Sequence, residues 1–231
     1  LRGPFNPGQP GQYASGGPTD NVLDIYKAAA PHIDLLTPDI YMPEYTHYTT
    51  VLDRYARPDN ALFVSETGNR DEYARYFFSA LGEQAIGWSP FGIDFSKYSN
   101  WPLGAKAMTP ETLADFALNY RLVAPAARLI AQASFDGKVR GTAEQPGQPV
   151  QTLKVDDRWN MVVTYGVPQF WFTGEPPANP QPIGRALVVQ LGPDEFLVTG
   201  AHARINLVAA DPAVANRQIY EYVDEGTFDA D

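Results

Sequence analysis

The stretch ALFVSETGN, residues 61–69, gives the strongest indication of how this chain folds. It begins with an apolar run, and turn-forming residues bound it on both sides, Pro-Asp-Asn at 58–60 and Gly-Asn at 68–69. A short apolar run rich in Phe and Val is typical of a strand buried on both faces. Glu66 follows that strand directly, and in parallel α/β proteins the catalytic groups gather at this end of the strands. The local pattern alone leaves open whether Glu66 is catalytic or a solvated residue at a strand end.

Similar strand and helix units lie on either side of this stretch. Strands are expected at residues 33–41 and 85–89, and helices at residues 21–30, 49–56 and 70–82, the last capped by Asn69. A longer helix is expected from Thr109, with Pro110 in its first turn, to about Ala133, with a kink at Pro125. Three strand–helix units in succession predict a parallel sheet with right-handed crossovers, which would form part of a (β/α)8 barrel.

The character of the sequence changes near Ser134, and no long helical period follows it. Short runs rich in β-branched and aromatic residues alternate with Gly, Pro and Asp, which is typical of antiparallel strands joined by turns. Strands are expected at residues 138–143, 150–155, 159–165, 185–191, 195–199, 204–209 and 218–223. The expected fold class is α/β plus all-β. Residues 1–133 would be the barrel part, and residues 134–231 a truncated antiparallel β-sandwich domain whose strand edges need covering.

Composition and charge narrow the classes of function. The 231 residues are 44% hydrophobic and 19% charged, as in an ordinary globular protein. The formal net charge of −10 argues against nucleic acid and anionic membranes as partners, and no segment is apolar enough to span a bilayer. The absence of Cys excludes disulfides and a Cys nucleophile, and the three His residues show no metal-ligand spacing. No metal or other cofactor is expected, and a neutral or cationic ligand is favoured.

Three segments carry a resemblance to a known family. TPDIYMP at 37–43, ALFVSETGN at 61–69 and IGWSPFGID at 86–94 occur in this order, with helices between them and an all-β region after them. Together they resemble the last three barrel strands of a bacterial glycoside hydrolase family 35 β-galactosidase with an appended β-sandwich domain. The resemblance implies strands six to eight of a (β/α)8 TIM barrel and retaining hydrolysis of terminal β-galactosides. The nucleophile of that family is a Glu at the end of the seventh strand, which Glu66 matches.

The resemblance also implies partners and further site residues. The acid/base Glu of the family ends the fourth strand, which is not in this sequence, so the partners would be a β-galactoside and an N-terminal part of the same polypeptide. Tyr41, at the end of the preceding strand, is expected to donate a hydrogen bond to Glu66, and Trp88 resembles the tryptophan that floors the sugar site. Asp39 and Trp101 are weaker candidates for binding sugar hydroxyls, as are Glu44, Asp94 and Asn100. The cellular compartment is open from composition, and the resemblance favours a periplasmic or secreted protein.

Two other classes of function stay open at this point. One is a carbohydrate-binding or structural module without catalysis, in which aromatic side chains of the β-rich half would contact the sugar; the candidates are Trp159, Phe170, Trp171 and Phe172. The other is a different barrel enzyme such as an aldolase, which would usually need a Lys at a strand end, and none of the three expected strands ends in Lys. The chain by itself is expected to be inactive, because three strands cannot close an eight-stranded barrel.

Overall fold

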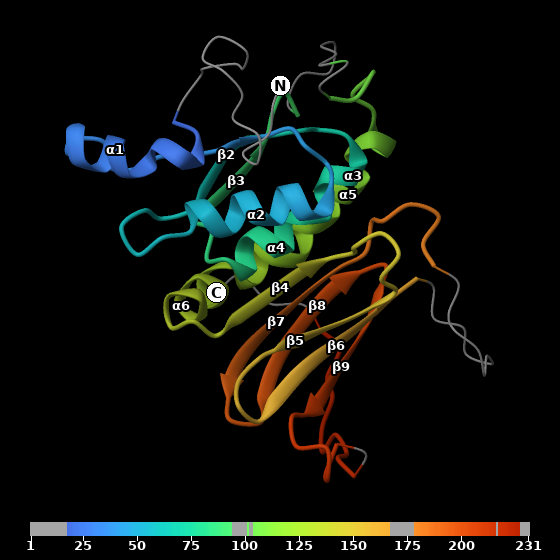
Figure 1. The fold of residues 1–231 in the computed structure, drawn as a ribbon. Helices are drawn as coiled ribbons and strands as arrows, with labels where there is room; N and C mark the ends of the chain where they lie inside the picture. The colour runs from blue at the N-terminus through green and yellow to red at the C-terminus, as the bar shows by residue number, and fades with distance from the viewer. Residues whose placement is uncertain (1–17, 94–100, 102–103, 167–177, 216, 227–231) are drawn as a thin grey trace.

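The computed structural model describes residues 18–93, 101, 104–166, 178–215 and 217–226 (Figure 1). These residues form a mixed α/β structure with one parallel and two antiparallel sheets of three strands each, and they contain no closed barrel. In Figure 1 the parallel sheet lies at the top, helices α2 and α4 lie beneath it, and the antiparallel strands lie below the helices. The Gly- and Pro-rich segment at residues 1–17, predicted to be a long loop, falls outside the described residues.

The parallel sheet consists of β1 (Asp39–Ile40), β2 (Phe63–Thr67) and β3 (Gly87–Pro90), in the order β1-β2-β3. Both pairings are parallel, which confirms the predicted direction of these strands. The first strand is much shorter than predicted. The Asn60 side chain accepts a hydrogen bond from the Leu36 N–H and donates one to the Leu36 carbonyl, each 2.9 Å long. The backbone groups of Leu36 are therefore paired with a side chain and not with a neighbouring strand.

The helices follow the predicted order with some changes in their bounds. They are η1 (Asp20–Val22), α1 (Leu23–Ala29), α2 (Tyr45–Tyr55), α3 (Asp71–Ala74), α4 (Tyr76–Gly82), α5 (Pro110–Val123), η2 (Ala124–Ala126) and α6 (Ala127–Phe135). Thr109 forms a capping box with Thr112, and the predicted kink at Pro125 is the 3-10 turn η2. The prediction that Asn69 caps the next helix is wrong. Its side chain instead binds the loop after β3, donating to the Phe91 carbonyl and accepting from the Ala105 N–H.

The two antiparallel sheets face each other, and together they are called the sandwich. One contains β4 (Val139–Ala143), β7 (Arg185–Gly192) and β8 (Glu195–Ala201), and the other contains β5 (Val150–Lys154), β6 (Trp159–Tyr165) and β9 (Ala203–Ala209). Ala186 and Val188 of β7 pack with Met161 and Val163 of β6 in a core between the sheets. Leu187 and Val189, on the other face of β7, belong to the larger core that includes the helices. Because β7 is buried on both faces, its sequence is an almost continuous apolar run.

Residues 218–223, predicted to be a strand, do not form one. The Gln218 side chain accepts a 2.6 Å hydrogen bond from the Ala209 N–H and donates to the Leu207 carbonyl, and the Tyr220 hydroxyl accepts from the Leu207 N–H. Side chains thus satisfy backbone groups along the free edge of β9, a position at which a further strand would otherwise pair.

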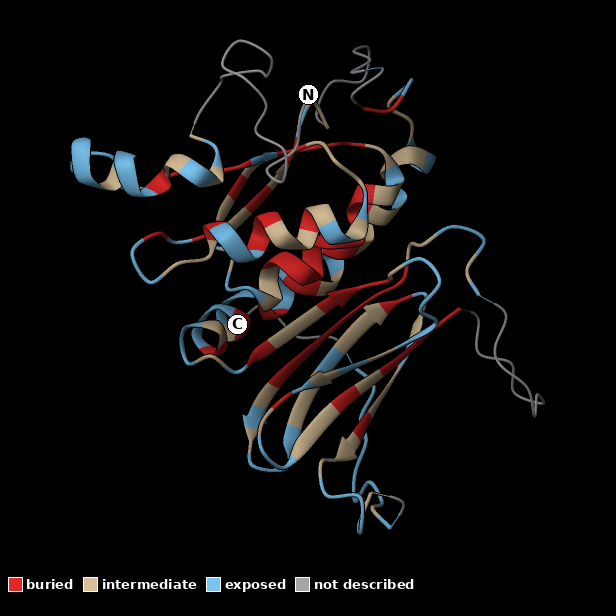
Figure 2. Cartoon of the chain, viewed as in Figure 1, coloured by how far each residue is buried: buried red, intermediate tan, exposed pale blue. Residues whose placement is uncertain are grey.

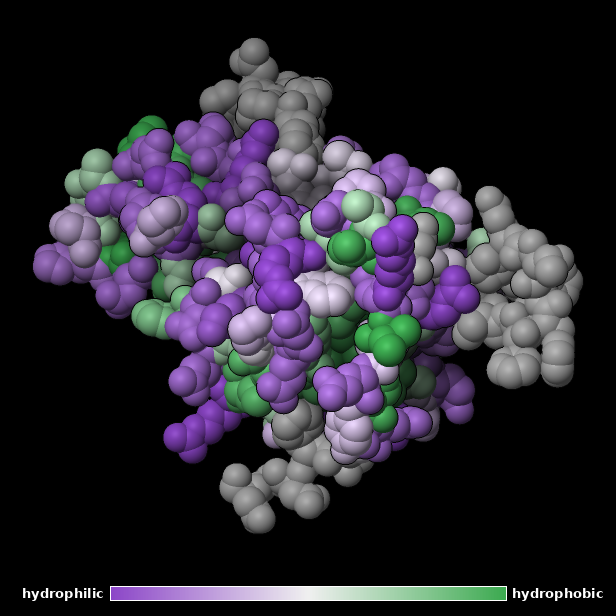
Figure 3. All heavy atoms as spheres, turned by 90° about the horizontal axis from the view of Figure 1, so that it is seen from below, coloured by the Kyte–Doolittle hydropathy of each residue, from purple (hydrophilic) through white to green (hydrophobic). Residues whose placement is uncertain are grey.

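Helix α4 rests directly on strand β4. A Cβ at Gly141 would lie 1.8 Å from the carbonyl oxygen of Phe78, and one at Gly82 would lie 2.4 Å from the Gly141 nitrogen. Only glycine allows this approach of two backbones. Figure 2 shows the buried residues concentrated along α4 where it faces the sheet, and Figure 3 shows a mostly hydrophilic lower face with hydrophobic atoms gathered near its centre. The helices and the sandwich therefore share one core, and the predicted domain boundary near residue 133 stays a prediction.

Candidate active site

A bulge in β2 determines where Glu66 points. The register between β2 and β3 shifts between Val64 and Thr67, where β2 has one residue more than β3. Val64 and Thr67 are both fully buried against the helices. Since side chains alternate along a strand, the extra residue leaves both Ser65 and Glu66 on the opposite face of the sheet. Glu66 lies within the strand and not after it, and bulges that re-aim a side chain in this way are frequent beside active sites.

Tyr41 is the hydrogen-bond partner of Glu66. Its hydroxyl donates to Glu66 Oε2 at 2.8 Å, so the predicted contact between the two is confirmed. Burial, the hydrogen bond to Glu66 and the charge of that carboxylate raise the pKa of Tyr41 far above its ordinary value. Tyr41 therefore keeps its proton and acts as a donor at any ordinary pH. A donor to a carboxylate stabilises its charged form, which is the form that a nucleophile needs.

The position of Tyr41 is held from the next helix. The Tyr73 hydroxyl donates to the Tyr41 carbonyl at 2.8 Å, and burial raises the pKa of Tyr73 to about 12, so this donor also stays protonated near neutral pH. The Tyr73 ring is fully buried, and a Cβ at Gly68 would lie 2.2 Å from it. Glycine at position 68 thus allows the ring to pack against the turn that follows β2.

Asp39 lies opposite Glu66 in the register of β1 and β2. Its carboxylate accepts a 2.9 Å hydrogen bond from the Ser65 hydroxyl, and its charge contributes with that of Glu66 to the raised pKa of Tyr41. Asp39 is exposed, whereas Tyr41 and Glu66 are half-buried. The structure thus brings two carboxylates, a phenol and a hydroxyl together on one face at the carboxyl end of the parallel sheet.

A buried chain of hydrogen bonds holds the opposite face of the same strands. The Trp88 indole N–H donates to the Tyr48 hydroxyl at 2.9 Å, Tyr48 donates to the Thr67 hydroxyl at 3.0 Å, and Thr67 donates to the Ile40 carbonyl at 2.9 Å. The indole can only donate and the Ile40 carbonyl can only accept, so the direction of every bond between them is fixed. The network connects β1, β2 and β3 through α2, directly behind Glu66.

Trp88, which the resemblance assigns to the floor of the sugar site, packs among core side chains in this structure. It is 7% exposed, and its ring centroid lies 5.4 Å from that of Phe77 and 5.9 Å from that of Phe116, two side chains of the helices. Trp88 therefore packs in the core on the helix side of the sheet, the face opposite to Glu66. Two features account for this orientation. Side chains alternate between the two faces along β3, and the Tyr48 hydroxyl accepts a hydrogen bond from the indole N–H.

Of the weaker candidates, Glu44 and Trp101 lie outside the helices and strands. Trp101 is 55% exposed, with the Lys106 ammonium 4.7 Å from its ring centroid. Glu44 precedes α2 and lies 3.8 Å from His47 Nδ1. Asp94 and Asn100 lie outside the described residues, as do Phe170, Trp171 and Phe172, and the half-buried Trp159 donates its indole N–H to Asp194 and the Pro193 carbonyl. The structure thus groups Asp39 and Tyr41 with Glu66.

The described ranges contain neither a candidate metal site nor a candidate membrane-spanning helix. No cluster of three or more acidic or His side chains there is arranged to hold a metal ion. No helix in the same ranges combines the length and apolar character that a membrane span needs.

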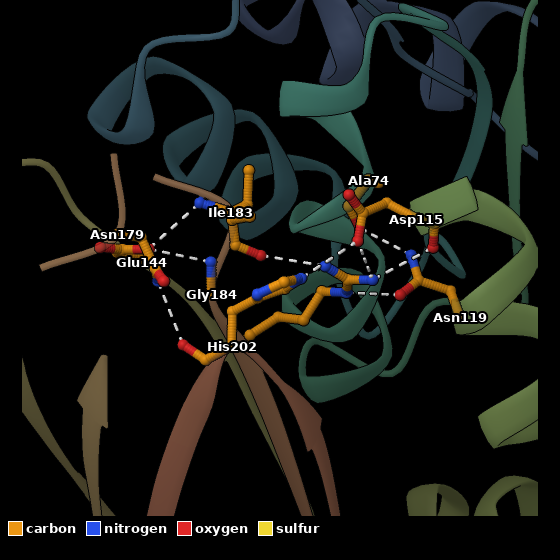
Figure 4. Close-up of polar contacts among 9 residues, drawn as sticks. Ala74, Asp115, Asn119, Glu144, Asn179, Ile183, Gly184 and His202 are labelled. Carbon is orange, nitrogen blue, oxygen red and sulfur yellow. Dashed lines mark hydrogen bonds and ion pairs between the residues drawn. The ribbon is translucent and has the colours of Figure 1, made fainter. Parts of the chain in front are cut away.

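A second polar cluster, which the sequence reasoning missed, joins the helices to the sandwich (Figure 4). Arg185 is fully buried and donates to the Asn119 side chain at 2.5 Å and to Asp115 Oδ1 at 2.9 Å. Beside it, Glu144 Oε2 accepts hydrogen bonds from the Gly184 N–H at 2.9 Å and from the Ile183 N–H and the Asn179 side chain. The one signal in the sequence was the charged residue at the start of the largely apolar strand RALVVQLG. Because these groups satisfy one another, the cluster is interpreted as structural.

Comparison with known proteins identifies one family. The family described as "Domain of unknown function (DUF5597)" matches residues 116–231, half of the chain, from within α5 through both antiparallel sheets. No curated protein matches the chain. Glu66 and the parallel sheet precede the matched region, and a domain of unknown function neither supports nor excludes the resemblance to β-galactosidases.

Proposed function

We propose that this chain, which belongs to the DUF5597 family, is the nucleophile-bearing part of a retaining glycoside hydrolase that acts on terminal β-galactosides. In this proposal β1, β2 and β3 are strands six to eight of a (β/α)8 barrel. A carboxylate oxygen of Glu66 attacks the anomeric carbon, the bond to the leaving oxygen breaks, and a covalent glycosyl-enzyme forms. Water then hydrolyses the intermediate and regenerates the Glu66 carboxylate.

The observation that carries the proposal is the hydrogen bond from Tyr41 to Glu66 on the sheet face that points away from the helices. In a (β/α)8 barrel the helices cover the outside, so the opposite face of the strands lines the interior, and the active site lies at the carboxyl end of the strands. Glu66 has that position and that orientation. Its other carboxylate oxygen, Oε1, has no hydrogen bond to any described residue and is proposed to attack the sugar.

The neighbours of Glu66 have separate roles in this mechanism. Tyr41 holds the Glu66 carboxylate in one orientation and stabilises its negative charge before attack. Its hydroxyl can stay hydrogen-bonded to Glu66 as that charge is lost on formation of the ester. Asp39, fixed by the Ser65 hydroxyl, has a second carboxylate oxygen without a partner among the described residues, and this oxygen is proposed to accept from sugar hydroxyl groups. The chain Trp88–Tyr48–Thr67 keeps the bulged strand from shifting behind the site.

The second carboxyl group of the mechanism is proposed to come from polypeptide that precedes residue 1. A retaining enzyme needs an acid about 5–5.5 Å from the nucleophile, which first protonates the leaving oxygen and then takes a proton from the attacking water. Asp39 is the carboxylate nearest to Glu66 by strand register, and it already accepts a hydrogen bond from Ser65. We assign it to hydroxyl binding and assign the acid/base to another strand.

Substitution of Glu66 in the complete enzyme tests the proposal. Glu66→Gln preserves shape and removes the nucleophile, so kcat on an aryl β-galactoside is expected to fall by about three orders of magnitude or more. Glu66→Ala leaves room for a small anion, and added azide is expected to restore turnover and give the α-galactosyl azide. Asp39→Asn is the matched control, with a smaller loss and no rescue by azide. Activity above about a tenth of wild type in Glu66→Gln would mean that the nucleophile is another residue.

A further inference from the structure

A cavity of about 410 Å³ lies between the helices and the sandwich, away from Glu66. Residues of α2 and α4 line one side of it, and residues of β4, β5 and the turn between them line the other. Its volume falls within the range of about 300–1,000 Å³ in which small-molecule sites occur, and such sites are frequent where two parts of a chain meet. The cavity shares no lining residue with the group formed by Asp39, Tyr41 and Glu66.

The inner wall of this cavity is formed by buried residues. Leu52 of α2, Ser79 of α4 and Thr142 of β4 are at most 6% exposed and line it. Gln148 and Thr152, which also line it, are exposed and form its rim. A ligand would therefore enter between exposed polar side chains and reach an apolar and hydroxyl-bearing wall.

The Gln151 side chain is held in place by hydrogen bonds, and among the described residues one of its N–H groups remains available as a donor. Its side-chain oxygen accepts hydrogen bonds from the Thr142 hydroxyl at 2.8 Å and from the Tyr165 hydroxyl, and its amide donates to the Tyr45 hydroxyl at 3.4 Å. A side-chain amide has two N–H groups, and within the described part of the chain the second one has no acceptor. The Tyr45 O–H proton likewise has no acceptor among those residues. Gln151 and Tyr45, which both line the cavity, thus each keep one donor without an acceptor among the described residues.

The charge of the lining disfavours an anionic ligand. Among the described residues that line the cavity there is no Lys, Arg or His, and the single charged side chain is the carboxylate of Glu83. The other polar groups are hydroxyls and neutral amides, which can donate and accept, and Leu52 and Leu153 add apolar surface. This combination suits a ligand with many hydroxyl groups and apolar C–H faces and no negative charge.

We infer that this cavity is a binding site for a neutral saccharide of one or two rings. The ligand would accept hydrogen bonds from Gln151 and Tyr45, donate to Glu83 and pack its C–H face on the leucines. Because the cavity is lined from both sides, a bound saccharide would bridge α2 and α4 to the β4–β5 turn. The inference does not depend on the role of Glu66.

The test is a titration of the 231-residue chain with lactose, cellobiose and maltose, followed through backbone amide signals in NMR spectra. Saturable shifts are expected at Gly141, which lines the cavity, for at least one of the three sugars, with a Kd of about 1 mM. The amide of Gly68, beside Glu66, reports binding at the other site, and Glu66→Gln is expected to leave the Gly141 response unchanged. Glucuronate, an anion, is expected to bind at least about tenfold more weakly.

Two variants and a control decide whether the cavity is the site. Thr152→Trp fills the exposed rim and is expected to weaken binding at least about tenfold, and Tyr45→Phe, which removes one hydroxyl, about threefold or more. Gln132→Ala, an exposed position on α6, is expected to leave the affinity unchanged. The inference is overturned if none of the sugars gives saturable shifts at Gly141 up to about 50 mM, if glucuronate binds as tightly as they do, or if neither cavity variant weakens binding.

Discussion

Tyr41 and Glu66 are 25 positions apart in the sequence and share a hydrogen bond in the structure. Tyr41 directly follows β1 and Glu66 is the last residue but one of β2, and the carboxyl ends of neighbouring parallel strands lie at the same edge of a sheet. This rule is enough to predict the contact from the sequence. It does not predict the bulge between Val64 and Thr67, which turns Glu66 away from the helices. The contact is therefore confirmed, and its catalytic role stays a prediction.

Tyr41→Phe removes the donor to Glu66 and keeps the ring. A hydrogen bond to a charged group contributes about 1.5–3 kcal/mol, so kcat of the complete enzyme is expected to fall about 10- to 100-fold. The measurement is steady-state hydrolysis of an aryl β-galactoside. Tyr26→Phe, on the exposed helix α1, is the matched control and is expected to leave kcat unchanged. A Tyr41→Phe enzyme with wild-type kcat would show that Tyr41 does not support the nucleophile.

Trp88 shows where the same rule is insufficient. It also lies near a strand end, but nothing in the segment IGWSP tells which face of the sheet it occupies. The alternation along β3 puts it on the helix side, where Tyr48 accepts its indole N–H. Its packing and its hydrogen bond both predict a contribution to stability and none to the sugar site.

Trp88→Phe is expected to lower the free energy of unfolding by about 2–4 kcal/mol, because it leaves a cavity and removes the donor to the buried Tyr48 hydroxyl oxygen. KM for a β-galactoside should change less than about threefold in the complete enzyme. Urea unfolding and steady-state kinetics measure the two effects. Trp159→Phe is the matched control, since the half-buried Trp159 bonds to exposed groups, and its loss should stay below about 1 kcal/mol. Unchanged stability with a KM raised tenfold would return Trp88 to the sugar site.

Among the elements, those defined by local chemistry were predicted best. Thr109 and Pro110 open α5 as predicted, and Pro125 interrupts the helix. The failures are residues 33–38 and 218–223, where the Asn60 and Gln218 side chains satisfy backbone groups in place of a strand. These hydrogen bonds connect a side chain to the backbone of a residue distant in the sequence, and strand propensity contains no information about them. Arg185 and its partners were missed for the same reason.

The contact of α4 with β4 was equally invisible in the sequence, although it fixes the helices on the sandwich. Gly141→Ala would place a methyl group 1.8 Å from the Phe78 carbonyl oxygen, so helix and strand would have to separate. We expect the free energy of unfolding to fall by about 3 kcal/mol or more. Urea unfolding of the 231-residue chain measures it. Gly192→Ala, whose new Cβ would meet ordinary contacts at 3.5 Å, should cost less than about 1 kcal/mol. Equal losses in both variants would contradict the close contact.

At the scale of the whole molecule, the described residues leave the parallel sheet with edges at β1 and β3 and with the Glu66 face uncovered by helices. The sandwich below shares its core with the helices and supports them from the other side. We propose that further strands of the same polypeptide pair with these edges and supply the acid/base. On this account the 231-residue chain alone holds the nucleophile and is inactive, because general acid catalysis and the closed pocket are lost together.

The most direct measurement is covalent trapping of the intermediate in the complete enzyme with 2-deoxy-2-fluoro-β-galactosyl fluoride. Fluorine at C2 slows both steps by destabilising the oxocarbenium-like transition state, and the fluoride leaving group speeds only the first, so the glycosyl-enzyme accumulates. Peptide mapping by mass spectrometry should find one fluorogalactosyl group, on Glu66, and none in Glu66→Gln. An adduct on another carboxylate, or no adduct in an enzyme that hydrolyses β-galactosides, would contradict the assignment of Glu66 as the nucleophile.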